Sequence, residues 1–260
     1  DSCVGCHAAA RDGLDLAVGY GSETEPALET ISTVTLSPGI DHARGIAGGW
    51  TTFSPDGAMV LVADDGKLVL RDANTGSAIG GSDGTVALPD GTYATHPDWS
   101  PDGSTVAIAY TQVPPTNLDV GSASIALLPY EGSGAFGSPQ VIVAAGSGAN
   151  NYFPRYSPDG GYLAYVHATE SSYGAPSAEL WLVSADGGTP IALAAASHHV
   201  GATPDLPGVA DTMPAWAPMA GAHAFLAFAS SRPYGAVNPD GGRQQIWVSA
   251  IDLTAPIAAR

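Results

Sequence analysis

The segment Phe153-Pro-Arg-Tyr156-Ser-Pro-Asp-Gly160 is one copy of a pattern that recurs along the chain and decides its fold. The other copies are Trp50-Thr-Thr-Phe53-Ser-Pro-Asp-Gly57, His96-Pro-Asp-Trp99-Ser-Pro-Asp-Gly103 and Met213-Pro-Ala-Trp216-Ala-Pro-Met219. In Ser-Pro-Asp-Gly the proline presets φ, the aspartate bonds its own backbone, and the glycine supplies a positive φ. Each copy therefore predicts a tight turn between two strands.

Two further short apolar strands follow each turn. The first of them covers residues 59–63, 105–109, 162–166 and 224–228, and the second covers residues 67–71, 124–128, 179–183 and 245–249. A meander of three or four strands cannot bury both of its faces alone, so neighbouring units must stack radially. The sequence thus predicts an all-β protein, a β-propeller, and the alternative is a β-sandwich with a recurring turn.

The repeats resemble those of the TolB translocation protein and of prolyl-oligopeptidase propeller domains. The matching stretches are residues 97–103, residues 154–160 and the strand with its turn at residues 180–187. The resemblance extends over nearly the whole chain and implies the propeller fold, but it says little about activity because this repeat serves many roles. No Gly-x-Ser-x-Gly elbow with a plausible Ser/His/Asp set stands out, so the resemblance implies no peptidase activity.

Composition limits the partners that the chain can have. The 260 residues are 45% hydrophobic and 13% charged, which is typical of a globular protein, and 25 acidic against 8 basic residues give a net charge of −17. Nucleic acid and anionic lipid would repel such a surface, so we expect no nucleic-acid partner. No apolar run reaches the roughly 18 residues of a transmembrane helix, so we expect no membrane span.

Residues 3–7 read Cys-Val-Gly-Cys-His and contain both cysteines of the chain. This string is the attachment signature of a c-type haem: the thiols of Cys3 and Cys6 add to the two porphyrin vinyl groups, and His7 ligates the iron. A Cys-x-x-Cys redox pair is an alternative, but no βαβ pattern surrounds it and His7 is then unexplained. A zinc site is another, but no second ligand pair follows. We predict one covalent haem c.

The haem motif falls inside the repeat pattern. Arg11-Asp-Gly13 takes the place of Pro55-Asp-Gly57, so the motif lies on the inner strand of a first blade rather than on a helix. Repeats begin near residues 5, 50, 95, 152 and 212, which predicts five blades in a single propeller domain over residues 1–260. The fifth repeat lacks a clear outer strand before Arg260, so we expect a missing region or another protein to complete the ring.

A second iron ligand is expected from another blade. Counting back from each turn places one set of residues at the start of the innermost strands, which line the axial channel: Cys6, Trp50, His96, Phe153 and Met213. His96 is our first choice and Met213 the second, because both residue types ligate haem iron. His96 has a plain structural interpretation as a hydrogen-bonding residue, and Met213 as packing. The alternatives are His42, the pair His198 and His199, or an open or water-bound position.

These features predict an exported monohaem electron-transfer protein, an electron carrier rather than a catalyst. Covalent haem attachment takes place outside the cytoplasmic membrane, so we expect a periplasmic or extracellular protein whose signal segment has been removed. The expected partners are redox proteins, other cytochromes or like subunits. One alternative is a binding or assembly module with a structural haem. The other is a haem enzyme such as a peroxidase, which requires a vacant distal position.

Overall fold

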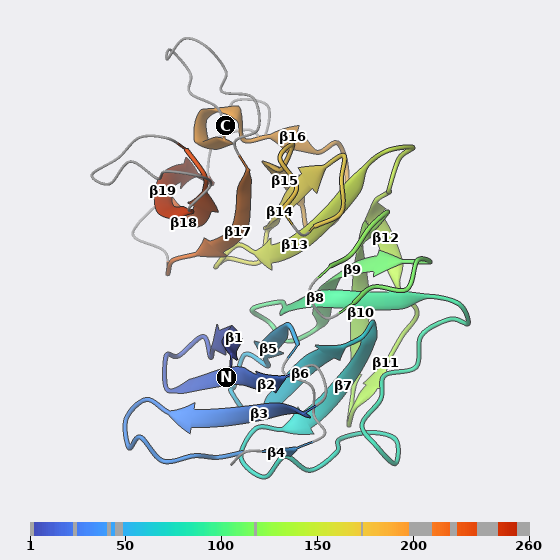
Figure 1. The fold of residues 1–260 in the computed structure, drawn as a ribbon, viewed down its shortest axis with the longest axis vertical. Helices are drawn as coiled ribbons and strands as arrows, with labels where there is room; N and C mark the ends of the chain where they lie inside the picture. The colour runs from blue at the N-terminus through green and yellow to red at the C-terminus, as the bar shows by residue number, and fades with distance from the viewer. Residues whose placement is uncertain are drawn as a thin grey trace.

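A computed structural model shows an all-β chain folded into five antiparallel sheets, as the repeats predict (Figure 1). The structure describes residues 3–22, 25–40, 43–44, 49–116, 119–172, 174–197, 210–218, 223–232 and 244–253. In each sheet, strands that follow one another in sequence are hydrogen-bonded neighbours, except that β12 pairs with β10 rather than with β11 in the third sheet. The β-propeller prediction is therefore confirmed, and the sandwich alternative is wrong.

The five sheets follow the chain from the first repeat to the last. The first contains β1 (Cys3–Ala9), β2 (Asp15–Ser22), β3 (Glu25–Ser32) and β4 (Ala43–Arg44). The second contains β5 (Thr51–Phe53), β6 (Met59–Asp64) and β7 (Lys67–Asp72). The third contains β8 (Tyr93–Trp99), β9 (Thr105–Thr111), β10 (Ser124–Gly132), β11 (Ala135–Phe136) and β12 (Gln140–Val143). The fourth contains β13 (Asn150–Tyr156), β14 (Tyr162–Ala168), β15 (Glu179–Ser184) and β16 (Ile191–Ala192). The last contains β17 (Asp211–Trp216), β18 (His223–Ser230) and β19 (Gln245–Asp252).

Helix is almost absent from the described part of the chain, where α1 (Ala194–Ser197) is a single turn. The residues around the haem motif form strands β1 and β2, as expected. None of the helical structure in the described ranges is long or apolar enough to cross a membrane.

The Ser-Pro-Asp-Gly turns have the geometry that their residues predict. In the turn after β8 the Ser100 hydroxyl donates to Asp102 Oδ1 at 2.6 Å, and Gly103 has a φ of 77°. The hydrogen bonds from Ser100 and then from Ser104 hold the pKa of the Asp102 carboxyl below its usual value. The turn thus closes on its own side chains and needs no tertiary contact to form.

The aromatic residue before each turn lies between neighbouring sheets. Phe53 packs against Ala17 and Leu28 of the first sheet, and Trp99 packs against Leu61 and its neighbours in the second. Tyr156 packs against the third sheet in the same way. In each case the aromatic side chain faces the preceding sheet, so burial of these rings joins the sheets into a series.

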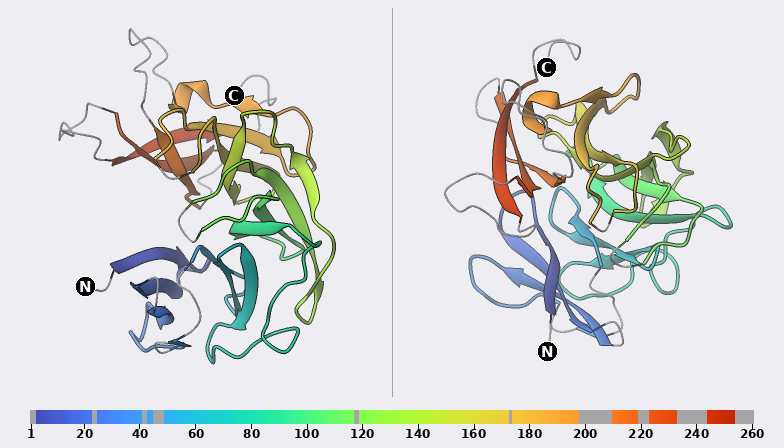
Figure 2. Two further views of the ribbon diagram at one scale, coloured as in Figure 1. Left: turned by 45° about the vertical axis from the view of Figure 1, so that its right-hand side comes forward. Right: turned by 45° about the horizontal axis from the view of Figure 1, so that its top comes forward.

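The inner strands follow one another around an axis in the order β1, β5, β8, β13 and β17. Figure 2 shows the result as an open arc, with the first and last sheets on the two sides of the opening. Among the described residues, the series of extensive contacts between successive inner strands does not close from β17 back to β1. The expected incomplete ring is what this part of the chain shows.

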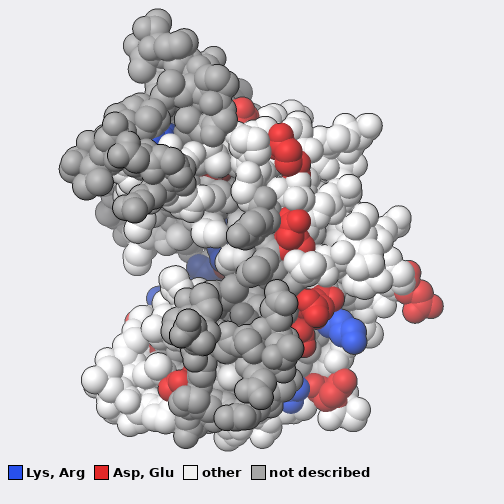
Figure 3. Space-filling view, viewed as in Figure 1, with Lys and Arg blue, Asp and Glu red and all other residues white. Residues whose placement is uncertain are grey.

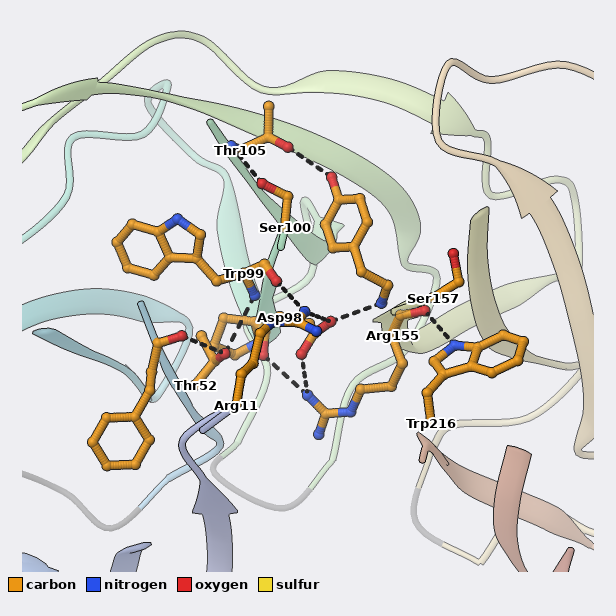
Figure 4. Close-up of polar contacts among 12 residues, drawn as sticks. Arg11, Thr52, Asp98, Trp99, Ser100, Thr105, Arg155, Ser157 and Trp216 are labelled. Atoms are coloured by element: carbon orange, nitrogen blue, oxygen red, sulfur yellow. Dashed lines mark hydrogen bonds and ion pairs between the residues drawn. The ribbon is translucent and has the colours of Figure 1, made fainter. Parts of the chain in front are cut away.

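One carboxylate joins three sheets beside the axis (Figure 4). Asp98 of β8 accepts a 2.7 Å hydrogen bond from the backbone N–H of Tyr156 and a 3.2 Å bond from Arg155 Nη1, both on β13. Arg11 of the first blade reaches past the second sheet, lying 3.8 Å from Asp98 Oδ2 and donating to the Trp99 carbonyl at 2.6 Å. Asp98 therefore holds the arc together at its centre.

We expect Asp98→Asn to lower the free energy of unfolding by about 2 kcal/mol, since hydrogen bonds to charged groups contribute about 1.5–3 kcal/mol. Urea unfolding followed by tryptophan fluorescence measures this loss. The matched control is Asp90→Asn at an exposed position, which should change the value by less than about 0.5 kcal/mol. Equal effects of the two substitutions would contradict a joining role for Asp98.

Candidate functional site

Four of the five described inner strands share a one-residue irregularity at the same place. The register shifts between Gly5 and Ala8 in β1, and equivalent shifts occur between Thr95 and Asp98, Tyr152 and Arg155, and Thr212 and Ala215. In each case two residues of the inner strand face one of its partner, which is a β-bulge. Bulges re-aim side chains, and in the third and fourth sheets they bring His96 and Phe153 into contact.

The first bulge residue has a left-handed backbone in three blades. His96, Phe153 and Met213 have φ angles of 50°, 52° and 53°. Such a conformation normally belongs to glycine, and a bulky residue there is an outlier that costs about 1–3 kcal/mol. A proline follows each of the three, so the second bulge position has no N–H that the broken ladder would leave unpaired. A strained position retained in three blades is a place to look for function.

The haem motif lies on this bulge. The register of β1 gives Cys6 the place of His96, Phe153 and Met213, and gives His7 the place of the proline that follows each of them. The His7 side chain is exposed. The structure thus places the motif on the inner strand of the first sheet. The side chains of Cys3 and Cys6 lie outside what the structure describes.

Side chains of the bulge level meet at the axis. The rings of His96 and Phe153 have centroids 4.0 Å apart, and Trp50 lies 4.7 Å from Phe153 and 4.9 Å from His96. Tyr152 closes the cluster, 6.1 Å from His96. Residues from three different sheets are thus in contact, as their equivalence in the repeats predicts.

His96 is a buried imidazole without a hydrogen-bond partner. It is 1% exposed, and neither ring nitrogen is bonded to any group. Burial, and after it the positive charge of Arg155, hold the pKa of His96 well below 6.5. The ring is therefore neutral at pH 7, the form that binds a metal ion. It is, however, enclosed by Trp50, Tyr152 and Phe153.

Met213 differs from His96 in exposure. Its side chain is 46% exposed, although its backbone has the same bulge conformation. The sequence placed both residues at one level of the axis, and the structure agrees with that placement. It adds that the Met213 thioether is open to solvent while the His96 imidazole is enclosed.

His42, His198 and His199 lie outside the described residues. Within the described ranges, no group of three or more His, Cys, Asp and Glu side chains is arranged to hold a metal ion. His167 is bonded through Nδ1 to Asn151 at 2.8 Å, which is a structural contact.

The sequence analysis did not identify the charged residues near the axis. Asp98, Arg155 and Arg11 were not singled out, although they form the ionic contacts beneath the ring cluster. The signal was available, because Asp98 and Arg155 occupy equivalent positions with opposite charges in neighbouring repeats.

Comparison with known proteins supports the fold. No family model matches the chain, and no curated protein matches it. Among solved structures, the putative TolB from Agrobacterium tumefaciens is 20% identical, with a TM-score of 0.56, over 97% of this chain and 78% of that one. Dihydro-heme d1 dehydrogenase NirN in complex with DHE is 19% identical (TM-score 0.51), over 97% of this chain and 45% of that one. A structure from a study of two prolyl endopeptidases is 13% identical (TM-score 0.50), over 97% and 43%.

The chain is therefore similar in structure to TolB and to the propellers of prolyl oligopeptidases. It spans less than half of the NirN and prolyl endopeptidase chains, so the likeness concerns only a part of each. At these identities the likeness establishes the fold.

We expect His96 to make the protein less stable in weak acid. As the pH falls through about 6.5, the pKa of His96 in the unfolded chain, the unfolded chain takes up a proton. In the folded protein the buried His96 stays neutral. The free energy of unfolding should then fall by up to about 1.4 kcal/mol per pH unit, and His96→Phe should remove this component. Urea unfolding from pH 7.5 to pH 5.5 measures it.

Both proteins in this comparison should carry Cys3→Ser and Cys6→Ser, so that no haem is attached. The pKa of His167 is also lowered, by partial burial, but His167 is present in both and its contribution cancels. Identical slopes against pH in the two proteins would show that His96 is not buried as described.

Proposed function

We propose that this protein is an exported c-type monohaem β-propeller that transfers electrons. Cys3 and Cys6 hold the haem covalently, and His7 is the first iron ligand. One observation carries the proposal: the unbroken Cys-x-x-Cys-His string occupies the bulge of β1, with His7 exposed where three other blades have proline.

The residues present fit a haem at this place. A bulge interrupts the strand ladder and leaves its residues free of the regular alternation of a strand. His7 is exposed, so its imidazole is accessible to an iron atom held beside the strand. The same scaffold occurs in NirN, which is named a dihydro-heme d1 dehydrogenase, so the fold is compatible with a haem compound.

The second iron ligand belongs to the bulge level in this proposal. The geometry favours Met213 over His96, because Met213 is 46% exposed while His96 is enclosed by aromatic rings. This reverses the order that the sequence indicated, and both residues remain predicted ligands. A methionine ligand raises the reduction potential and a second histidine lowers it, within a range of about 0.8 V.

The bound haem would supply a one-electron couple between ferric and ferrous iron. The chain's own residues hold the group at one strand and exclude water with the aromatic rings of the axis. The net charge of −17 favours redox partners with a positively charged face. Acidic side chains are spread over the right-hand side of the face in Figure 3. Attachment chemistry places the protein in the periplasm or outside the cell.

Intact mass spectrometry of protein from its native source should show one added haem on the chain. Cys3→Ser combined with Cys6→Ser should abolish the added mass and the haem stain on a denaturing gel. His7→Ala should lose the proximal ligand, with a changed absorption spectrum. An unmodified mass in the native protein would overturn the proposed function.

Met213→Ala should convert the iron from low spin to high spin and allow it to bind carbon monoxide, with the attachment unchanged. His96→Ala should leave the spectrum as it is if the thioether is the ligand. The opposite pattern would identify His96. An unchanged spectrum in both variants would place the ligand at His42, at His198 or His199, or in a partner, whereas a native iron that binds carbon monoxide freely favours a haem enzyme.

A further inference from the structure

The outward face of the last sheet is apolar and uncovered. Three cross-strand pairs of β18 and β19 form it, and we call these six residues the terminal apolar face: Phe225 with Ala250, Ala227 with Val248, and Ala229 with Ile246. Ile246 is 82% exposed and Val248 is 62% exposed. None of the six side chains is polar. The alternate residues of β18, among them Leu226 and Phe228, are buried on the other face in the core shared with the fourth sheet.

An uncovered face of this kind needs an occupant. In the interior sheets of the arc both faces are covered, as Tyr165 and Val166 show by being buried on opposite faces of β14. A row of exposed apolar residues on an edge strand is otherwise a site of aggregation. The terminal apolar face therefore points to a ligand or a partner.

The packing of the sheets determines the direction in which the terminal apolar face is oriented. Successive sheets pack face to face, and the other face of the last sheet already meets the fourth. The terminal apolar face is thus turned to the opening of the arc, with the first sheet on the far side (Figure 2). The molecular surface is hollowed between these two sheets (Figure 3).

The first sheet presents the haem motif to the same opening. Ala9 occupies the position of Phe53, Trp99 and Tyr156, whose rings face the preceding sheet. On the first sheet that direction is the opening. Here the large ring is replaced by an exposed alanine, and His7, two residues earlier on the strand, is exposed as well. The substitution leaves room beside the motif where every following sheet has an aromatic side chain.

The bulge level links the two sides of the opening. Bulge-level side chains of the second, third and fourth sheets touch one another around the axis. Met213 has the same position on the last sheet and Cys6 has it on the first. The two positions are therefore neighbours across the opening.

We propose that the haem, attached as in the proposed function on which this inference rests, occupies the opening of the arc and packs against the terminal apolar face. The flat apolar macrocycle of the haem then takes the place of the contact that the first and last sheets do not make with each other. The first sheet supplies the attachment and His7, and the last sheet supplies the apolar wall and the Met213 thioether.

The test compares Val248→Glu in the terminal apolar face with Leu36→Glu, a control at a 79% exposed leucine elsewhere. Intact mass first establishes that haem is attached in each protein. Val248→Glu should then reduce the Soret circular dichroism at least twofold and speed cyanide binding about tenfold, while Leu36→Glu should match the wild type. Attached haem with wild-type values in Val248→Glu overturns the inference and leaves the proposed function standing. Absence of the haem mass from the native protein overturns both.

Two further measurements distinguish loss of haem packing from a folding defect of the Val248→Glu protein. Val248→Thr keeps the shape of the side chain and replaces one methyl group by a hydroxyl, so it should show the same changes to a smaller degree. The Cys3→Ser and Cys6→Ser protein, which carries no haem, should bind 8-anilinonaphthalene-1-sulfonate at least threefold more than the haem-bound protein. Equal dye binding, or a haem-bound dimer that Val248→Glu dissociates, would assign the face to another occupant and overturn the inference.

Discussion

The whole arc depends on sheets that cannot bury both of their faces alone. One aromatic side chain per repeat, Phe53, Trp99 or Tyr156, projects from an inner strand into the preceding sheet and joins the two. Burial of such rings is the main favourable free energy that a small sheet can obtain. The same dependence makes the two ends of the arc different from its middle, because each end has one face without a neighbour.

The axis is the second level of organisation, and it contains both strain and charge. His96, Phe153 and Met213 hold left-handed backbones that glycine would adopt at lower cost. The strain is accompanied by tight ring contacts and by the carboxylate of Asp98, which bonds two neighbouring inner strands at once. A backbone that is strained in a fixed way presents its side chains at fixed positions, which suits an attachment point for a rigid cofactor.

Residues 3–7 form the start of the first blade and differ from the other repeats at the positions that follow. Its cysteine and histidine replace the bulge residue and the proline of the other repeats, and an alanine replaces the aromatic that would fill the next gap. Each of these replacements concerns a residue that faces the axis or the opening. The turn that follows the motif keeps the pattern, with the Gly13 N–H bonded to the Ala10 carbonyl at 2.9 Å.

The sequence by itself determined the meander, the turns and the equivalence of the inner strands. These features rest on local chemistry: proline, aspartate and glycine close each turn, and alternating apolar residues define each strand. It also contains the Cys-Val-Gly-Cys-His string, whose spacing is the basis of the proposed haem attachment. Only the tertiary structure decided that His96 is enclosed and Met213 open, that Asp98 is shared by three blades, and that one face of the last sheet is uncovered. Those properties depend on which sheets are neighbours in space, and exposure is a property of the packed arrangement that no single repeat contains.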